Sequence, residues 1–164
     1  MPADTGAQTL EHENASLLRR LFTSLQARDH AVMADCYAPA ATFRDIAFDL
    51  HDRREIHAMW RMVCTTTRVT VTIQSIEADD HAGRARIVDD YTFSDTQRRV
   101  INPIESRFRF ENGRIVEQRD ECDARRWADQ AFGGLKGWLA GRIRLLRARA
   151  AARKLQPYLT RSSG

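Results

Sequence analysis

Apolar residues recur at three- and four-residue steps near the start of the chain, which predicts an amphipathic helix from Glu13 to Arg28. The residues on this stripe are Leu17, Leu18, Leu21, Phe22 and Leu25. A second, short helix is expected from about His30 to Tyr37, with Asp29 as its N-cap. It should stop at Ala38-Pro39, because the residue before a proline disfavours helical backbone angles.

A third helix is predicted from about Arg53 to Cys64, again because its apolar residues share one face. These residues are Ile56, Met59, Trp60 and Val63. A brief strand over Ala41 to Asp45 should precede this helix. Three helices are therefore expected before the main sheet.

From Arg68 onward the apolar period changes from about four residues to two, which is typical of half-buried strands. Val69, Val71 and Ile73 alternate with Thr70, Thr72 and Gln74. The further predicted strands are Arg84 to Ser94, Arg98 to Glu111 and Gly113 to Cys122. Asn112-Gly113 between the last two is the clearest hairpin turn in the chain.

After Asp123 the pattern becomes helical again, and the predicted helices run from Arg125 to Leu159. Their apolar stripe consists of Leu135, Leu139, Ile143, Leu146 and Ala150. Glycines at 133, 137 and 141 would line one helix face and permit close packing, while a break is expected near Gly133-Gly134 because glycine weakens helices. We expect these helices to pack on the domain or on a dimer partner.

Charge is distributed unevenly. Residues 124–164 carry ten Lys or Arg and one acidic residue, Asp129, whereas the preceding residues carry 16 basic and 21 acidic side chains. Nucleic acid is not expected as a partner, because the motifs and interleaved aromatic residues of nucleic-acid modules are missing. Contact of the basic tail with an anionic membrane surface is the alternative to packing. Packing is favoured because an isolated amphipathic helix needs a surface to bury against.

The length of 164 residues fits one domain, and the composition is that of an ordinary globular protein. No apolar run approaches the roughly 18 residues of a membrane span, and Met1 to His12 lacks the pattern of a secretory signal. The expected organisation is a disordered leader (1–12), the domain (13–123) and the basic helical tail (124–164). Cys36, Cys64 and Cys122 are widely spaced, so we interpret them as reduced, buried residues of a cytoplasmic protein.

The order of elements and several short stretches resemble the nuclear transport factor 2-like superfamily, which includes ketosteroid isomerase, scytalone dehydratase, limonene epoxide hydrolase and the SnoaL-type polyketide cyclases. The stretches that carry this resemblance are Arg20–Phe22, Ala27–Asp29, Tyr37–Asp45, Asn102–Ile104, Phe108–Phe110 and Gly113–Glu117. The resemblance covers about residues 13 to 123. It implies a cone-shaped fold in which three N-terminal helices pack on a strongly bent, mainly antiparallel sheet, and a homodimer that pairs through the outer sheet face.

The resemblance also implies where chemistry would occur. Asp45 falls where the isomerase has its general base, and Asp120 is similar to the acid/base aspartate of the SnoaL-type cyclases. Leu21 and Ser106 stand where the isomerase has its oxyanion-hole tyrosine and protonated aspartate, so ketosteroid isomerisation is not expected. The candidate substrate-binding residues are Leu21, Phe43, Trp60, Tyr91, Ser106, Phe108 and Gln118.

The expected function is cofactor-free acid/base chemistry on a small apolar molecule by Asp120 and Asp45. No His, Asp or Glu group has the spacing of a metal site, and no phosphate-binding loop or nucleophile elbow is present. The alternative is a ligand-binding or accessory module of the same fold that does not react. Asp89 and Asp90 are adjacent on a predicted strand, so one faces inward and one outward, and the sequence leaves open which.

Overall fold

The N-terminal helices form as the apolar spacing predicts. A computed structural model describes residues 11–160, so residues 1–10 of the expected leader lie outside the described residues. The three helices are α1 (Glu13–Ala27), α2 (His30–Asp35) and α3 (Arg53–Thr66). Asp29 is confirmed as the N-cap of α2, because its side chain accepts a hydrogen bond from the Val32 amide at 3.1 Å.

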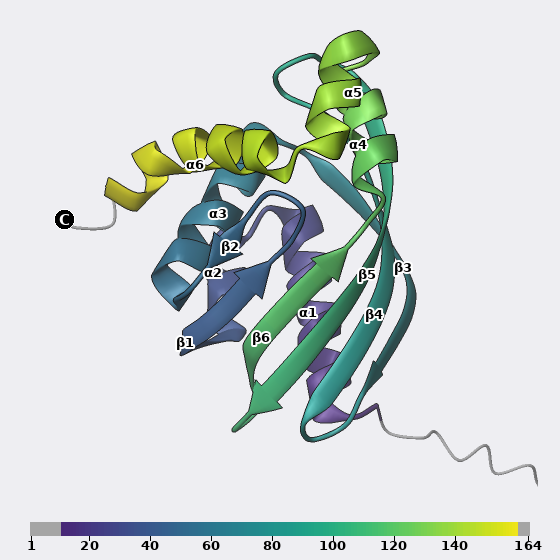
Figure 1. Cartoon of the computed structure of the whole chain (residues 1–164). Coiled ribbons are helices and arrows are strands. Elements are labelled where there is room, and N and C mark those ends of the chain that lie inside the picture. Colours follow the sequence, from purple (N-terminus) through teal and green to yellow (C-terminus); the bar gives the residue numbers. More distant parts are fainter. Residues whose placement is uncertain (1–10, 161–164) are drawn as a thin grey trace, which may run out of the picture.

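A six-stranded sheet follows the change to a two-residue period, in the order β2-β1-β6-β5-β4-β3. Its strands are β1 (Tyr37–Arg44), β2 (Asp49–Leu50), β3 (Val69–Ala78), β4 (Ala82–Thr92), β5 (Arg99–Glu111) and β6 (Arg114–Glu121). All neighbouring pairs are antiparallel except β1 with β6. The sheet bends around α1 and α3, which gives the expected cone-shaped α+β fold (Figure 1).

The first strand begins earlier than predicted. We expected helix as far as Tyr37 and a strand only from Ala41, but Tyr37 already pairs with Ile115 of β6. Pro39 lies where the register of this pair shifts, between Tyr37 and Thr42. A proline there removes no regular ladder hydrogen bond, which is why the strand tolerates it.

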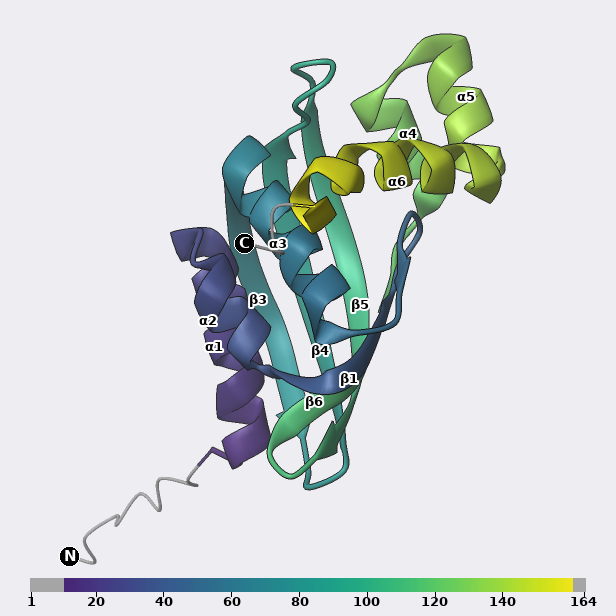
Figure 2. The ribbon, with the colours of Figure 1, turned by 90° about the vertical axis from the view of Figure 1, so that its left-hand side faces the viewer.

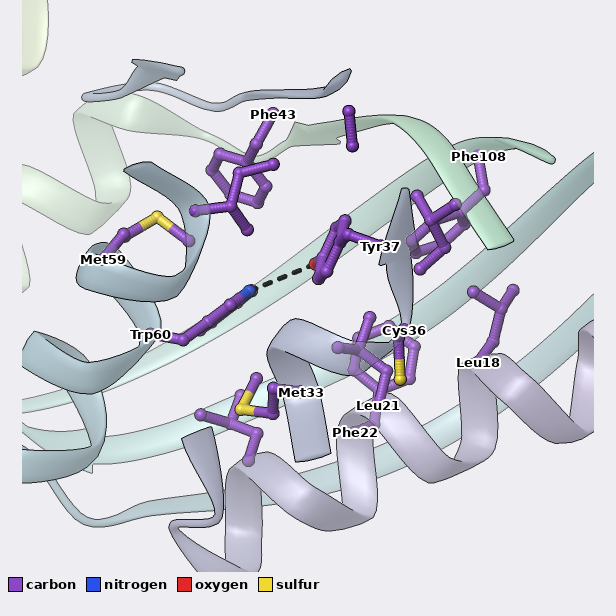
Figure 3. Packing of buried hydrophobic residues seen from close by; sticks show 14 of the residues in the cluster. Leu18, Leu21, Phe22, Met33, Cys36, Tyr37, Phe43, Met59, Trp60 and Phe108 are labelled. Atoms are coloured by element: carbon purple, nitrogen blue, oxygen red, sulfur yellow. Dashed lines mark hydrogen bonds between the residues drawn. The ribbon is translucent and has the colours of Figure 1, made fainter. Parts of the chain in front are cut away.

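The hydrophobic core lies between the inner sheet face and the three helices. It includes Leu18, Leu21 and Phe22 of α1, all at most 3% exposed, and Phe108 of β5. Figure 3 shows these side chains gathered between the helices and the strands, with Trp60 pointing toward Tyr37. The far end of the sheet, where β6 ends and α4 begins, holds the polar inner residues and is called the tail end below.

Three tail helices continue from β6: α4 (Ala124–Ala131), α5 (Gly134–Arg142) and α6 (Arg144–Thr160). The break at Gly133-Gly134 is confirmed, and both glycines have positive φ. The glycine packing is confirmed at two positions, since a Cβ on Gly137 would lie 2.8 Å from the Ala128 carbonyl oxygen and one on Gly141 2.9 Å from Arg125 Cα. Figures 1 and 2 show α4 and α5 standing at the tail end and α6 crossing over α3.

The predicted apolar stripe of the tail does not mediate its packing. α6 packs against α3 through Ala151 and Leu155, whereas Leu135, Ile143 and Leu146 are exposed. The stripe from Leu135 to Ala150 requires one continuous helix after Gly134, but α5 ends at Arg142. The extended backbone of Ile143 turns α6 away from α5, so the residues of the stripe do not share one face. Within residues 11–160, no helix combines the length and apolar character needed to cross a membrane.

Candidate functional site

Three aspartates converge inside the cone near its tail end. Asp120 lies on β6, Asp89 lies on β4, and Asp45 directly follows β1. Each is partly buried. The negative charge of Asp120 raises the pKa of Asp89, that of Asp45 raises the pKa of Asp120, and that of Asp89 raises the pKa of Tyr91. Among residues 11–160, none of the three forms an ion pair with Lys, Arg or His. They are therefore buried carboxyl groups without a neutralising partner in contact.

A chain of hydrogen bonds leads from helix α3 to Asp120. The Trp60 indole Nε1 donates to the Tyr37 hydroxyl at 3.1 Å, and Tyr37 donates to Gln118 Oε1 at 2.5 Å (Figure 3 shows the first bond). Gln118 Nε2 then donates to both oxygens of Asp120, at 3.0 and 3.1 Å. Because the indole can only donate, every bond in the chain has one direction, and it ends on the carboxylate.

Burial dominates the protonation of Asp120 and raises its pKa to about 7. The Gln118 hydrogen bond opposes this shift by favouring the charged form, and the charge of Asp45 adds to it. Ser106 lies opposite Asp120 in the β5–β6 register, and its hydroxyl also lowers the pKa of Asp120. Within residues 11–160, the Ser106 Oγ nonetheless has no partner that meets the geometry of a hydrogen bond.

Asp89 faces inward and Asp90 outward, which resolves the choice that the sequence leaves open. Asp90 forms a two-pronged ion pair with the exposed Arg99, at 2.9 and 2.6 Å. Burial raises the pKa of Asp89 to about 7, and the negative charge of Asp120 raises it further. Its Oδ1 is buried without a hydrogen-bond partner in the described part of the chain. A buried carboxyl oxygen left unpaired is rare in proteins and calls for an explanation.

Asp45 is engaged by its own turn. Its Oδ1 accepts hydrogen bonds from the amides of Ala47 and Phe48 at 2.7 and 2.6 Å, which orders the loop between β1 and β2. Burial raises the pKa of Asp45, while those two amides and the positive charges of Arg144 and Arg147 lower it. One of its oxygens therefore has a structural role.

Tyr91 follows Asp89 on the same face of β4. Its hydroxyl accepts a hydrogen bond from the Trp127 indole of α4 at 2.8 Å, and burial raises its pKa to about 12. The hydroxyl stays protonated at neutral pH. The tail helix α4 therefore contacts β4 two residues from Asp89.

The remaining candidates separate into two groups. Gln118 and Ser106 accompany Asp120, as described above. Phe43 and Trp60 contact each other edge to face at 5.8 Å beside the hydrogen-bond chain. Leu21 and Phe108 belong to the packed core, where Phe108 contacts Phe22 and Phe110.

Neither of two hollows in the described structure is lined by the three aspartates. One, of about 320 Å³, is lined by Arg86, Glu105 and Glu121, which point out of the cone, and by residues near the start of α4. The other, of about 520 Å³, lies at the opposite end, between His12 and the β3–β4 and β5–β6 turns. Within residues 11–160, no three His, Cys, Asp or Glu side chains are placed to hold a metal ion.

Sequence reasoning did not select Asp89, although a signal was present. Ile87 and Tyr91 are each two residues from Asp89 on the strand, and both lie on the inner face, so Asp89 must face inward as well.

Sequence reasoning also did not find the contribution of the tail. Arg147 donates from Nε to the Ile46 carbonyl at 2.9 Å and from Nη1 to the Ala140 carbonyl at 2.5 Å. This contact across more than one hundred residues of sequence has no local pattern.

Comparison with solved structures shows the same fold at low sequence identity. An LEH-like epoxide hydrolase of M. tuberculosis aligns with a TM-score of 0.64 and 20% identity, over 77% of this chain and 95% of that one. IdmH, a putative polyketide cyclase from Streptomyces antibioticus, gives 0.61 and 20%, over 73% and 98%. A putative SnoaL-like polyketide cyclase from Jannaschia sp. CCS1 gives 0.67 and 13%, over 77% and 96%.

Among curated proteins, none matches the chain in sequence. The sequence pattern of the SnoaL-like domain family, however, matches residues 18–118, which is more than half of the chain and runs from α1 to Gln118 in the hydrogen-bond chain. The fold, the order of the elements and this match agree. The chain belongs to the SnoaL-like domain family.

Proposed function

We propose that the protein is a cofactor-independent acid/base enzyme that acts on a small, mostly apolar molecule, as an isomerase, cyclase or hydratase. The observation that carries this proposal is the pair Asp89 and Asp120, two inward carboxyl groups whose pKa values both lie at about 7. A group with a pKa near the working pH can both accept and donate a proton, as general acid/base catalysis requires. Structural carboxylates are normally held ionised by a basic partner instead.

Unpaired polar atoms beside these carboxyl groups support a ligand site. Asp89 Oδ1 and Ser106 Oγ are buried without hydrogen-bond partners in residues 11–160. A polar group of a substrate placed on the inner face of β4, β5 and β6 would satisfy them and recover the free energy that their burial costs. The surrounding aromatic and aliphatic side chains suit an apolar substrate body.

The residues then take distinct roles. Asp120 transfers the proton, and Gln118 orients its carboxylate at the end of the chain from Tyr37. Asp89 is the second acid/base group. Asp45 acts at a distance, since its charge raises the pKa of Asp120 while its own oxygen holds the β1–β2 turn.

The experiment is a turnover screen with a matched pair of adjacent substitutions. Wild type, Asp120→Asn, Asp89→Asn and Asp90→Asn are tested on apolar cyclic ketones and epoxides, and ligand binding is followed separately by native mass spectrometry. We expect Asp120→Asn to lose at least about 100-fold in kcat, Asp89→Asn to lose activity as well, and Asp90→Asn to behave as wild type. Turnover that Asp120→Asn leaves unchanged would reject Asp120 as the acid/base group. Ligand binding without turnover by wild type would reject catalysis and leave a binding module.

We also propose a cytoplasmic homodimer that pairs through the outer sheet face. Exposed charges of both signs alternate there, as in the pairs Arg86–Glu105 and Arg107–Glu121. A two-fold related copy could exchange such partners, because the same patch meets itself. The free thiols of Cys36, Cys64 and Cys122 support a reducing compartment. A monomeric mass by light scattering at micromolar concentration would reject the dimer.

A further inference from the structure

The tail exposes an unusual number of large apolar side chains. Leu135 is 73% exposed, Leu145 56% and Trp138 49%, and Ile143 and Leu146 are exposed by 40% and 42%. All five lie within residues 135–146, in α5, at the break at Ile143 and in the first turn of α6, and are called the tail surface below. Exposed apolar clusters of this kind mark interaction sites in soluble proteins.

The orientation of α5 explains why these side chains point away from the domain. Gly137 and Gly141 face α4, where each would bring a Cβ to less than 3 Å of its backbone. Leu135, Trp138 and Arg142 recur at steps of three and four on another face of the helix, so they are directed outward. The close glycine contact thus fixes which residues α5 presents to the surroundings.

Cations surround the tail surface. Lys136, Arg142, Arg144 and Arg149 are exposed between or beside its apolar residues, and Arg142 lies over the Trp138 ring at 4.5 Å. Residues 130–160 contain no acidic side chain, and the nearest carboxylate on α4 is Asp129, whose Cα lies beside Gly137 on the face of α5 opposite to that of the tail surface. The tail surface therefore combines apolar side chains with an excess of cations.

This combination distinguishes between possible partners. A second copy of the chain would bring the same cations together without a carboxylate to neutralise them. Nucleic acid would use the arginines but leave Leu135, Leu145 and Leu146 exposed to water. An anionic bilayer accepts both components, because leucine and tryptophan enter its headgroup region while Lys and Arg contact lipid phosphates.

We propose that the tail surface binds anionic lipid bilayers and attaches the domain to them peripherally. The inference is independent of the proposed enzyme activity, since the aspartate pair contributes nothing to it. The direct test measures partition of the full chain onto vesicles of phosphatidylserine and phosphatidylcholine, roughly one to two, against vesicles of pure phosphatidylcholine. We expect at least tenfold stronger partition onto the anionic vesicles, which falls as salt is added.

Two pairs of substitutions locate the contact. Arg142→Gln with Arg149→Gln should weaken partition by roughly 25-fold, about fivefold for each cation removed. Leu145→Ser with Leu146→Ser should weaken it at least tenfold without changing net charge. The matched control, Arg20→Gln with Arg54→Gln at exposed positions of α1 and α3, removes the same charge and should leave partition within about twofold.

Trp138 supplies an internal probe. Anionic vesicles should shift the tryptophan emission to shorter wavelength in wild type, and the shift should vanish in Trp138→Phe, which retains Trp60 and Trp127. Equal partition onto both kinds of vesicle would overturn the proposal. The same holds if the control variant partitions onto anionic vesicles as weakly as the tail variants. A dimer in light scattering that Leu145→Ser with Leu146→Ser converts to a monomer, or binding of duplex DNA that the tail substitutions abolish, would also overturn it.

Discussion

Gln118 donates from one amide nitrogen to both carboxylate oxygens of Asp120, at 3.0 and 3.1 Å. The two residues lie two positions apart on the inner face of β6, so the strand itself sets their spacing. Because Gln118 Oε1 accepts from Tyr37, the amide cannot rotate to present its oxygen to Asp120. The fold thereby holds a carboxyl group in a defined orientation although burial disfavours its charge.

Removing the Tyr37 hydroxyl should loosen this arrangement. In Tyr37→Phe, the Trp60 indole loses its acceptor and Gln118 Oε1 its donor, both in a buried region. We expect the free energy of unfolding to fall by about 1 to 3 kcal/mol and the pKa of Asp120 to rise above its value of about 7, because a less ordered Gln118 favours the charged form less. Chemical denaturation and carboxyl NMR titration measure the two effects.

The control is Trp60→Phe, which breaks only the first bond of the chain. It should destabilise the fold but leave Tyr37 donating to Gln118, so the pKa of Asp120 should stay close to that of wild type. Equal pKa values in Tyr37→Phe and wild type would show that the chain does not orient the carboxylate.

Asp89 should make the protein less stable as pH rises. Its pKa is about 7 in the folded chain and near 3.8 when unfolded, so folding takes up a proton between these values. The free energy of unfolding contributed by this group therefore decreases as pH rises from about 4 to about 7 and stays low above that range. Asp89→Asn should stabilise the protein at pH 8 by about 1 to 3 kcal/mol and change little at pH 4.

Asp90→Asn is the matched control, because the neighbouring carboxylate faces solvent and pairs with Arg99. Its effect on stability should be small, as for exposed ion pairs, and should be destabilising at pH 8. Thermal unfolding at both pH values separates the variants. Destabilisation of Asp89→Asn at pH 8 would mean that Asp89 has a favourable partner when ionised.

Gly137→Ala tests the packing of α5 on α4, because helix propensity and packing predict opposite changes in the stability of the tail. Alanine is the better helix former by about 1 kcal/mol, yet its Cβ would lie 2.8 Å from the Ala128 carbonyl oxygen, and backbone cannot yield cheaply. We expect net destabilisation of the tail, seen as faster amide exchange in α5. Lys136→Ala, at an exposed neighbouring position, should leave exchange unchanged or slower.

Arg147 should hold the tail against the β1–β2 turn. Its guanidinium bonds the carbonyls of Ile46 and Ala140, so Arg147→Ala frees two partly buried acceptors. Amide exchange should accelerate in residues 45–48 and in α5, at a cost of about 1 to 3 kcal/mol of local stability. Arg149→Ala removes an exposed arginine two positions from Arg147. A similar acceleration of exchange in that variant would contradict a specific role of Arg147.

Local patterns predicted most of the fold. The three helices, the long strands and the Asn112-Gly113 turn each depend on periodicity or turn chemistry within a short segment, and these expectations are met to within a few residues. The start of β1 at Tyr37 was missed because its partner, Ile115, is far away in sequence. Parallel pairing leaves no hairpin signal between the strands.

The site was predictable only in part, for a similar reason. The alternation on β6 places Gln118 and Asp120 inward, and the structure has them there. The orientation of Asp120 depends on Tyr37 and Trp60, which come from two other elements. The tail was predicted as helices, but which of its faces is buried depends on the breaks at Gly133 and Ile143, and their angles follow from tertiary contacts.

The most direct test is a titration of the aspartate carboxyl carbons by NMR, with Asp89→Asn and Asp120→Asn used to assign the two signals. Asp89 and Asp120 should both titrate at about 7, because burial without a basic partner disfavours their charged forms. In Asp120→Asn the pKa of Asp89 should fall, since the repelling charge is gone. Titration of both carboxyl groups near 4, as in exposed aspartates, would contradict the assignment of an acid/base pair to this site.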